Sequence, residues 1–587
     1  MAWANDLRKI FRRAAKGTPA RAPMVGWYDP GQLVVTALRA VLSDVFATRA
    51  DYRVVQALSD RLEVAEHGGA KALPPSYEDR GELWIDYVAD TGDGFRSTFA
   101  IASQLGQKEL AVTGVPQPLP RGDVLIMGGD QVYPTPTAQA YRDRLVQPYE
   151  AAFPAADGGN QPDLYAIPGN HDWYDGLQSF TDIYCFGSQL GGWRTPQSRS
   201  YFALKLREDV WLLGVDVQLA SDIDQMQKDY FCGLGIKKGD RVILCTPEPD
   251  WVYRKIFTGK TRLGAFEALL VEKGARIVLK IAGDQHHYRR HTLVLDGKDA
   301  DCHLITAGGG GAFLHPTHTH DVKEIPIGGS SESEAFFDLR KEYPSRERSR
   351  LLGLYNAAFP LINPKFGVAT AVVYLVLSWV MPVPQYSANF SSMMTQLVDG
   401  AIEGLATSPA SLVWVLAILA LVVAFTDAQR PLYRWVGGLT HGLCHLGAAM
   451  AISALTMRSA DPVDPVGAQG ERVLSAYDRL MVSCAELAGG YVVGSLIMGL
   501  YLLISVVFFS MHGNEAFSSL KLTGYKNFLR MRLTDKELTV WAIGVERVPQ
   551  SGDWAWENGR WKLAADRKIE CELIDAPIHI PIGDPPS

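Results

Sequence analysis

Several features that would assign the chain to a familiar class are absent from its 587 residues. The seven cysteines form no CxxC pair and no spacing typical of a disulfide framework, so we expect reduced thiols in a reducing compartment. The net charge of −7 argues against a nucleic-acid partner bound through overall basic charge. The N-terminus also lacks the apolar core of a secretory signal.

Length and composition indicate a multi-domain protein with an ample core. At about 150 residues per domain, the chain should contain three or four structural units. A hydrophobic content of 47% and a charged content of 21% exclude intrinsic disorder. The mean hydropathy of −0.01 indicates that some segments are far more apolar than the rest.

The first segment, MAWANDLRKIFRRAAKG, predicts a basic amphipathic helix. Its apolar residues share one helical face, and its basic residues lie mostly elsewhere. This pattern fits a helix on an anionic membrane surface, and a frayed basic tail explains it equally well.

Four long uncharged stretches follow the first 350 residues, in which no apolar run is long enough to cross a bilayer. Residues 366–383, 404–426, 435–457 and 487–511 can each span about 30 Å of hydrocarbon as a helix. Most flanking Lys and Arg residues lie on one side, and the other side has only Arg458, Arg472 and Arg479. We therefore expect a multi-pass protein of a bacterial inner membrane, in contact with the lipid bilayer, with its N-terminus and the large N-terminal domain in the cytoplasm.

A few residues within and after these stretches stand out. His441 and His445 share a helical face, which suggests a metal or proton site or, as we favour, two histidines satisfied by neighbouring helices. The GxxxG of Gly490 and Gly494 favours close helix packing. Residues 512–587 contain strand-like runs and tryptophans, which predict a small cytoplasmic β-rich unit.

Polar side chains follow five apolar, strand-like runs in the first 350 residues. Because the carboxyl ends of neighbouring strands meet at one rim of a sheet, we expect these side chains to converge. Oxygen donors mixed with imidazole suit Mn²⁺, Fe, Zn²⁺ or Mg²⁺, and such a set can form a two-metal site for displacement at phosphorus. The five blocks are Asp90-Thr91-Gly92-Asp93, Gly128-Gly129-Asp130-Gln131-Val132-Tyr133, Pro168-Gly169-Asn170-His171-Asp172, Cys245-Thr246-Pro247 and Gly283-Asp284-Gln285-His286-His287.

These blocks resemble the calcineurin-like metallophosphoesterase superfamily, whose motifs run DxH or DxG, GD, GNH(D/E), a later His and GHxH. The resemblance covers about residues 83–320. Asp90-Thr91-Gly92 and Gly129-Asp130-Gln131-Val132-Tyr133 are most similar to the DxG and GDxxY of the purple acid phosphatase branch. The resemblance implies an α/β metallophosphoesterase fold, a β-sandwich flanked by helices, with two divalent or mixed-valence ions of Mn, Fe or Zn.

The resemblance also implies a role for each matched residue. Asp90, Asp130, Tyr133 and His286 would hold the first metal. Asp130 would bridge the two metals and Asn170 would hold the second. His171 would protonate the leaving group.

Two positions depart from the family pattern, both on the side of the second metal. Cys245 stands where the family has a metal-binding His, and Asp284 replaces the first His of GHxH. Asp284 can still donate an oxygen and Cys245 a thiolate, although a Cys after a strand is more often a small buried residue. We favour a second site retuned to a different ion over a domain that has lost catalysis.

The segment after the last block supplies further candidates. His315 or His318, which follow a glycine run, could replace a missing metal ligand, or could belong to a solvated loop. Arg289 and Arg290 could stabilise phosphoryl charge, or could be a surface pair.

We expect a membrane-anchored, metal-dependent hydrolase of a phosphate mono- or diester, and the membrane region suggests a lipid-linked substrate. The alternative is a catalytically reduced domain that senses a phosphorylated ligand on a membrane protein. The expected organisation is an N-terminal extension (1–80), the catalytic domain (81–330), a charged linker (331–365), four transmembrane helices (366–511) and the C-terminal unit (512–587).

Overall fold

The chain forms two compact units. A computed structural model describes residues 21–35, 74–155, 161–217, 223–256, 263–327, 335–380, 390–426, 431–458, 475–557, 560–564 and 567–582. The strand-rich unit comprises Met1–Val25, Thr36–Arg346 and Lys521–Ser587, and the helical unit comprises Gly26–Val35 and Glu347–Leu520. The predicted amphipathic helix of the first segment lies outside the described residues and stays a prediction.

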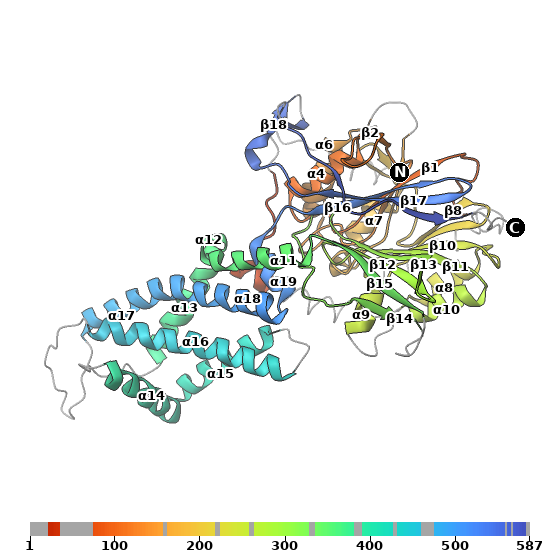
Figure 1. The fold of residues 1–587 in the computed structure, drawn as a ribbon. Helices are drawn as coiled ribbons and strands as arrows, with labels where there is room; N and C mark the ends of the chain where they lie inside the picture. Colours follow the sequence, from red (N-terminus) through yellow and green to blue (C-terminus); the bar gives the residue numbers. More distant parts are fainter. Residues whose placement is uncertain are drawn as a thin grey trace. The chain divides into compact units, whose positions relative to one another are not determined.

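The strand-rich unit contains two large mixed sheets (Figure 1). The first has the order β20-β17-β16-β1-β4-β5-β7-β6, with β21 beside β17. Its strands are β1 (Leu83–Val88), β4 (Val124–Met127), β5 (Asp163–Ala166), β6 (Gln189–Leu190), β7 (Trp193–Arg194), β16 (Lys526–Leu533), β17 (Glu537–Val545), β20 (Glu572–Leu573) and β21 (Ile578–Pro581).

The second sheet has the order β14-β15-β12-β13-β11-β10-β9-β8. Its strands are β8 (Phe202–Arg207), β9 (Val210–Gly214), β10 (Arg241–Thr246), β11 (Arg276–Ala282), β12 (Tyr288–Leu295), β13 (Lys298–Ala307), β14 (Glu324–Pro326) and β15 (Phe336–Tyr343).

The core lies between these sheets and under the helices that cover them. Ile85 of β1 and Leu529 of β16 share one apolar cluster with Ile243 of β10 and Ile281 of β11. On the outer faces, helices α4 (Phe95–Leu105) and α7 (Gln178–Tyr184) pack on the first sheet, and α8 (Gln225–Cys232) and α10 (Gly264–Glu272) pack on the second. The expected sandwich flanked by helices is thereby confirmed.

Parallel pairing brings the predicted blocks to common edges. In the first sheet, Val88 of β1 is in register with Met127 of β4, which is in register with Ala166 of β5. In the second sheet, Thr246 of β10 is in register with Ala282 of β11. All five strand-like runs are therefore strands, and each block begins at or just beyond the carboxyl end of its strand.

The C-terminal strands do not form the separate unit that the sequence predicts. Strand β16 pairs antiparallel with β1, from Leu83↔Leu533 to Tyr87↔Leu529, and β17 pairs with β16 in turn. The Asp86 carboxylate accepts bonds from the fully buried Arg530 guanidinium at 2.7 and 3.0 Å. These strands complete the first sheet, so the helical unit is an insertion between β15 and β16.

The charged segment 331–365 is also more than a linker. Of its described residues, Phe336–Tyr343 form β15, which lies between β12 and β14 in the second sheet. Helix α11 (Arg346–Gly353) follows. The charged residues of β15 alternate with Phe337 and Leu339, so the strand period is present but diluted by exposed charge.

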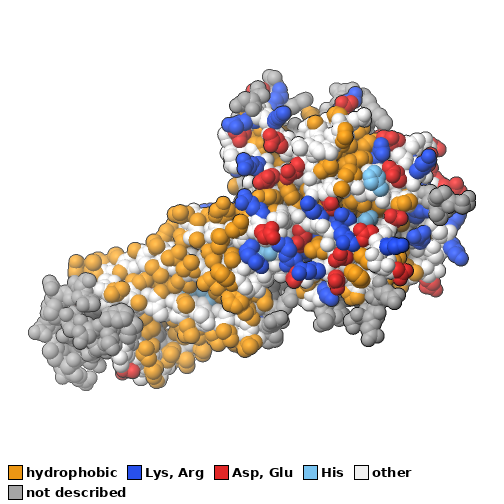
Figure 2. Space-filling model, viewed as in Figure 1, with side chains coloured by type: hydrophobic (Ala, Val, Ile, Leu, Met, Phe, Trp, Pro, Cys, Tyr) orange, Lys and Arg blue, Asp and Glu red, His pale blue; other side chains and the backbone are white. Residues whose placement is uncertain are grey.

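The helical unit consists of α12 (Phe359–Ile362), α13 (Pro364–Val380), α14 (Phe390–Thr407), α15 (Pro409–Phe425), α16 (Pro431–Arg458), α17 (Ala476–Gly489), α18 (Ser495–Phe509) and α19 (Gly513–Leu520). Figure 2 shows hydrophobic side chains over most of the visible face of these helices, whereas the strand-rich unit has mixed charges. Large apolar side chains such as Trp379, Leu421 and Phe508 are exposed.

Two helices are long and apolar enough to cross a membrane, or up to four if each of two bent pairs is one span, among the residues that the structure describes. The single spans are Leu432–Thr456 and Ala476–Phe509. The predicted stretch 404–426 is not one helix, because Ser408 caps a new helix that starts at Pro409, and the pair bends by 110°. The last span begins at Ala476, earlier than the predicted residue 487, and it therefore includes Glu486, which is buried.

The GxxxG glycines form a π-helical turn, η4 (Gly490–Gly494), between α17 and α18. A Cβ at Gly490 would meet the Ala371 backbone of α13 at 2.8 Å, and one at Gly494 would meet the Thr370 side chain at 2.6 Å. The close packing of this turn on α13 agrees with the interpretation of GxxxG as a helix-packing motif.

Candidate active site

Three aspartates that follow strand ends adopt the left-handed backbone conformation. Asp90 follows β1 with φ of 57°, Asp130 follows the glycine pair after β4 with φ of 49°, and Asp284 follows β11 with φ of 67°. Such a conformation is costly for residues with a Cβ, about 1 kcal/mol or more each, and it persists where the surroundings enforce it. Its recurrence after three strands of the two sheets makes these strand ends a candidate functional site.

The Tyr133 hydroxyl lies at the centre of the first set of predicted ligands. It is 2.9 Å from Asp90 Oδ1, 3.1 Å from Asp130 Oδ2 and 2.9 Å from His286 Nε2. All four side chains are at least 97% buried. The structure thus brings together the four residues that the resemblance assigns to the first metal.

The orientation of His286 is fixed by its other ring nitrogen. Nδ1 is 2.7 Å from the Phe313 carbonyl, which only accepts, so Nδ1 carries the proton and Nε2 presents a lone pair to Tyr133. Burial lowers the pKa of His286 well below its ordinary value and keeps the ring neutral. The His315 ring stacks on His286 with centroids 3.8 Å apart. A neutral imidazole held by a carbonyl is the usual form of a metal ligand.

The carboxylates of this cluster lack ordinary solvation. Burial, and then the negative charges of Asp130 and Asp284, raise the pKa of Asp90 well above its usual range. Burial and the charge of Asp284 raise the pKa of Asp130 to about 7. Without a further positive charge, the folded chain therefore favours protonated carboxyls here.

The donor set fits a divalent cation chemically. When Asp90 and Asp130 are ionised, the Tyr133 hydroxyl has one proton for three neighbouring acceptors, so lone pairs exceed protons at this point. A cation would relieve both this excess and the repulsion among the carboxylates. Within the described part of the chain, no group of three or more His, Cys, Asp and Glu residues has the geometry of a metal site. The convergence seen here includes a tyrosine hydroxyl, which is outside those four residue types.

The loop after β5 supplies the residues assigned to the second metal. The His171 backbone N–H donates to Asp130 Oδ1 at 2.9 Å, which ties this loop to the first set of ligands. A Cβ at Gly169 would overlap the Asp130 carboxylate, so only glycine allows this approach. Asn170 and His171 are partly exposed, whereas the ligands around Tyr133 are buried. The site is therefore more open to solvent at Asn170 and His171 than around Tyr133.

The two departures from the family pattern occupy different surroundings. Asp284 lies in the site, where its backbone N–H donates to Asp90 Oδ2 at 2.8 Å and its carboxylate accepts a bond from Tyr253. Cys245 is fully buried in the apolar cluster between the sheets, and burial raises the pKa of its thiol. These surroundings disfavour a thiolate and agree with a small buried residue at position 245.

The remaining candidates lie mostly away from the carboxylates. Arg289 is fully buried, pairs with Glu342 at 2.8 Å and donates to the carbonyls of Thr317 and His320. Arg290 pairs with Asp575 at 2.7 Å. His318 is buried in the loop that Arg289 holds. The structure therefore places His315 beside the site and gives the two arginines structural partners.

Lys526, which begins β16, is a member of the site that the sequence analysis missed. It is fully buried, donates to the Ala312 carbonyl and interacts electrostatically with Asp93 and Asp90. Burial lowers its pKa to about 7, against the opposing effect of these carboxylates. Lys526 lies 438 positions after Val88, the last residue of β1, so no local motif marks it, and only the pairing of β16 with β1 brings it to the site.

Asp172, the last residue of GNHD, positions the loops of the site. Its carboxylate accepts from the Gly169 N–H at 2.9 Å, the Gln131 N–H at 3.2 Å and the Tyr141 hydroxyl at 2.5 Å. It thus joins the loops after β4 and β5. The sequence analysis assigned Asp172 no role of its own, although its position directly after His171 in the GNHD block marked it as a candidate.

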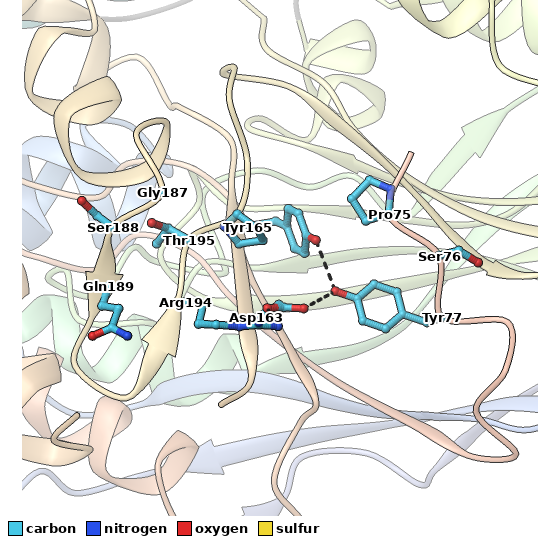
Figure 3. A pocket seen from close by; sticks show the side chains of 11 residues that line it. Pro75, Ser76, Tyr77, Asp163, Tyr165, Gly187, Ser188, Gln189, Arg194 and Thr195 are labelled. Atoms are coloured by element: carbon cyan, nitrogen blue, oxygen red, sulfur yellow. Dashed lines mark hydrogen bonds and ion pairs between the residues drawn. The ribbon is translucent and has the colours of Figure 1, made fainter. Parts of the chain in front are cut away.

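A cavity of about 470 Å³ lies elsewhere in the strand-rich unit (Figure 3). Its lining includes Tyr77, whose hydroxyl donates to Asp163 at 2.7 Å and lies 3.2 Å from the Tyr165 hydroxyl. Asp163 begins β5, whereas the site follows the end of β5. The cavity and the site therefore lie at opposite ends of this strand, and the cavity contains none of the predicted site residues.

Comparison with known protein families agrees with this interpretation. Residues 83–288 match the family model described as calcineurin-like phosphoesterase. No curated protein matches the chain. One matching solved structure, described as "Structure of PhoD", is 12% identical with a TM-score of 0.25 and covers 46% of this chain. The chain spans 65% of the length of that chain. The family match supports a calcineurin-like phosphoesterase domain over residues 83–288, and members of that family are metal-dependent hydrolases.

The raised pKa of Asp130 predicts a pH-dependent stabilisation by metal. In the metal-free protein, Asp130 titrates at about 7 when folded and near 3.8 when unfolded, so its contribution to stability is present below pH 3.8 and is lost as the pH rises to 7. A bound cation favours the ionised form and removes this loss. We expect the difference in melting temperature between metal-loaded and metal-stripped protein to widen from pH 4 to pH 7. A difference that is flat across this window would contradict the placement of Asp130 at a cation.

Proposed function

We propose that the chain is a membrane-anchored, metal-dependent phosphoesterase that hydrolyses a phosphate mono- or diester. The convergence of Asp90, Asp130 and His286 on one hydroxyl, inside a calcineurin-like domain, is the observation that supports this proposal most directly. Bound ions would supply an activated water and neutralise charge on the phosphoryl oxygens. Asp90, Asp130, Tyr133 and His286 would hold one ion, and Asp130, Asn170 and Asp284 the other.

The surroundings of His171 support a role for this residue as a general acid. Its Nδ1 is 2.7 Å from the Pro134 carbonyl, so Nδ1 carries a proton and Nε2 is the atom that exchanges one with a substrate. The ring is partly exposed, beside the buried Asp130. This geometry suits a general acid that delivers a proton to the leaving oxygen once the ring is protonated. Burial lowers the pKa of His171, so the protonated ring is a strong acid when it forms.

We expect His171→Gln to lower the rate about 100-fold or more for an alkyl phosphate, whose leaving oxygen needs a proton. The loss should be much smaller for an aryl phosphate with an acidic phenol, because that leaving group departs as an anion. Steady-state rates for the two esters measure this contrast. His579→Gln, at an exposed position of strand β21, is the control. Equal losses on both esters would remove His171 from the role of general acid.

Tyr133 permits a spectroscopic test of the proposed link to the purple acid phosphatase branch. If the Tyr133 oxygen binds Fe(III), iron-loaded protein should show a visible charge-transfer band, and Tyr133→Phe should abolish it while the aromatic ring still fills its place. Absorbance of the two proteins at equal iron content is the measurement. A colourless parent at full iron loading would exclude Tyr133 from the ligands.

The apolar surface of the helical unit supports membrane anchoring. An ester with a lipid tail would reach a site tethered at a membrane more readily than one dissolved in bulk, so we propose a phospholipid or lipid-linked phosphate as the substrate class. Comparing a short-chain soluble ester with the same headgroup in vesicles tests this choice. A preference for the soluble ester would favour a soluble substrate instead.

A ligand sensor is the second candidate, and one observation favours it. Both departures from the family pattern lie on the side of the second metal, and Cys245 is enclosed in the apolar core. Elemental analysis separates the two functions, since two ions per chain favour the enzyme. One or none, together with binding of phosphate without turnover, would favour the sensor.

A further inference from the structure

Four buried ionisable side chains of the helical unit come from helices that pack against one another. His441 is 2% exposed, His445 is 7% exposed, and Tyr374 and Glu486 are fully buried. They come from three helices, α13, α16 and α17, which pack against one another. Ionisable groups inside apolar helices are costly, and they usually mark a pathway or a binding site. Anchoring alone does not need them.

Hydrogen bonds connect three of these groups in a chain. The Tyr374 hydroxyl is 3.0 Å from His445 Nδ1, and His445 Nε2 is 3.1 Å from His441 Nε2. The two ring nitrogens of His445 therefore contact two different partners. An imidazole in this arrangement can accept a proton on one nitrogen and release one from the other.

The hydrogen-bonded series of Tyr374, His445 and His441 has polar neighbours at both ends. At the His441 end, Nδ1 is buried and has no hydrogen-bond partner in the described structure, and the ring stacks on Tyr501 with centroids 4.1 Å apart. The Tyr501 hydroxyl continues to Thr426 at 3.1 Å and to His512 at 3.4 Å. Beside the Tyr374 end, Glu486 on α17 accepts a bond from Ser453 of α16 at 2.5 Å. Polar groups therefore extend beyond the three hydrogen-bonded side chains in both directions.

We propose that Tyr374, His445 and His441 form a proton relay within the helical unit, which conducts protons when its helices span a membrane. The Tyr374 O–H proton passes to His445 Nδ1, the His445 Nε2 proton passes to His441 Nε2, and the His441 Nδ1 proton passes to a water molecule, which becomes hydronium. A hydronium ion on the other side returns a proton to the Tyr374 oxygen, so one proton enters for each that leaves. This function is separate from ester hydrolysis, which uses none of these side chains.

The test uses the full chain in vesicles of phosphatidylcholine and phosphatidylglycerol that contain a trapped pH-sensitive dye. A potassium diffusion potential made with valinomycin drives protons inward. We expect the parent to acidify the interior faster than protein-free vesicles do. We expect His445→Gln and Tyr374→Phe each to lower this rate about tenfold or more, because neither replacement can pass a proton.

The two variants separate a relay from a merely structural role. Glutamine keeps a hydrogen-bonding side chain at position 445, and phenylalanine keeps the ring at position 374, so packing should survive. Helical content equal to the parent's, measured by circular dichroism in both variants, would show that the helical unit is folded, and His579→Gln is the matched control on an exposed histidine. A parent that acidifies no faster than empty vesicles, or a His445→Gln protein with the parent's flux, would overturn the proposal.

Discussion

Replacing Asp130 with asparagine should lower ester hydrolysis at least about 100-fold, since even outer-shell changes at metal sites cost 10–100-fold. Asp130 contacts both halves of the site, through the Tyr133 hydroxyl at 3.1 Å and the His171 N–H at 2.9 Å. Asparagine has nearly the same shape but no charge, so it cannot bridge two cations. Steady-state rates and metal content of the purified protein measure the effect, and both should fall together.

Asp163→Asn is the matched control for this change. Asp163 begins β5 at the far end of the strand, where it bonds to Tyr77 in the cavity of Figure 3. Loss of its charge should leave the rate and the metal content nearly unchanged. An Asp130→Asn protein that binds two ions and turns over like the parent would remove Asp130 from the site.

Replacing Arg530 with methionine should lower the free energy of unfolding of the strand-rich unit by about 3–5 kcal/mol. Arg530 of β16 and Asp86 of β1 are both buried and share two bonds of 2.7 and 3.0 Å. Methionine leaves the Asp86 carboxylate buried without its partner, which is the costly case for an ion pair. Trp541 is in register with Arg530 on the neighbouring strand and stacks on Trp84 with centroids 5.5 Å apart, so tryptophan fluorescence during urea unfolding reports the loss.

Arg532→Met provides the comparison within the same strand. Arg532 is about one-third exposed and lies 3.6 Å from Glu537, so its removal should cost less than about 1 kcal/mol. If the two variants unfold at the same urea concentration, the buried pair is not what holds β16 against β1.

The first half of the site could be predicted from sequence because its signals are local. Each block follows an apolar run, and parallel strands bring such runs to one edge, as Val88, Met127 and Ala166 show. The glycines beside the aspartates mark close approach: a Cβ at Gly283 would meet Asp90 Oδ2 at 2.8 Å. Residue type, order and spacing therefore determined which side chains meet.

Features that depend on distant pairing could not be predicted in this way. Lys526 enters the site only because β16 pairs with β1, across an insertion of all the long helices. The burial of Cys245 depends on which face of β10 meets the other sheet, and an uninterrupted apolar run does not reveal that face. The bend at Ser408 was visible as a Ser-Pro pair, but hydropathy alone does not detect a break between two apolar helices.

Metal-dependent hydrolysis by the full chain tests the central claim most directly. Purified protein is stripped of metal, and hydrolysis of an aryl phosphate mono- and diester is then followed as Mn²⁺, Fe or Zn²⁺ is added to the parent and to Asn170→Ala. We predict that at least one metal restores activity to the parent, and that Asn170→Ala stays far below it. No activity with any of the three metals, with the parent and Asn170→Ala behaving alike, would contradict the proposed phosphoesterase.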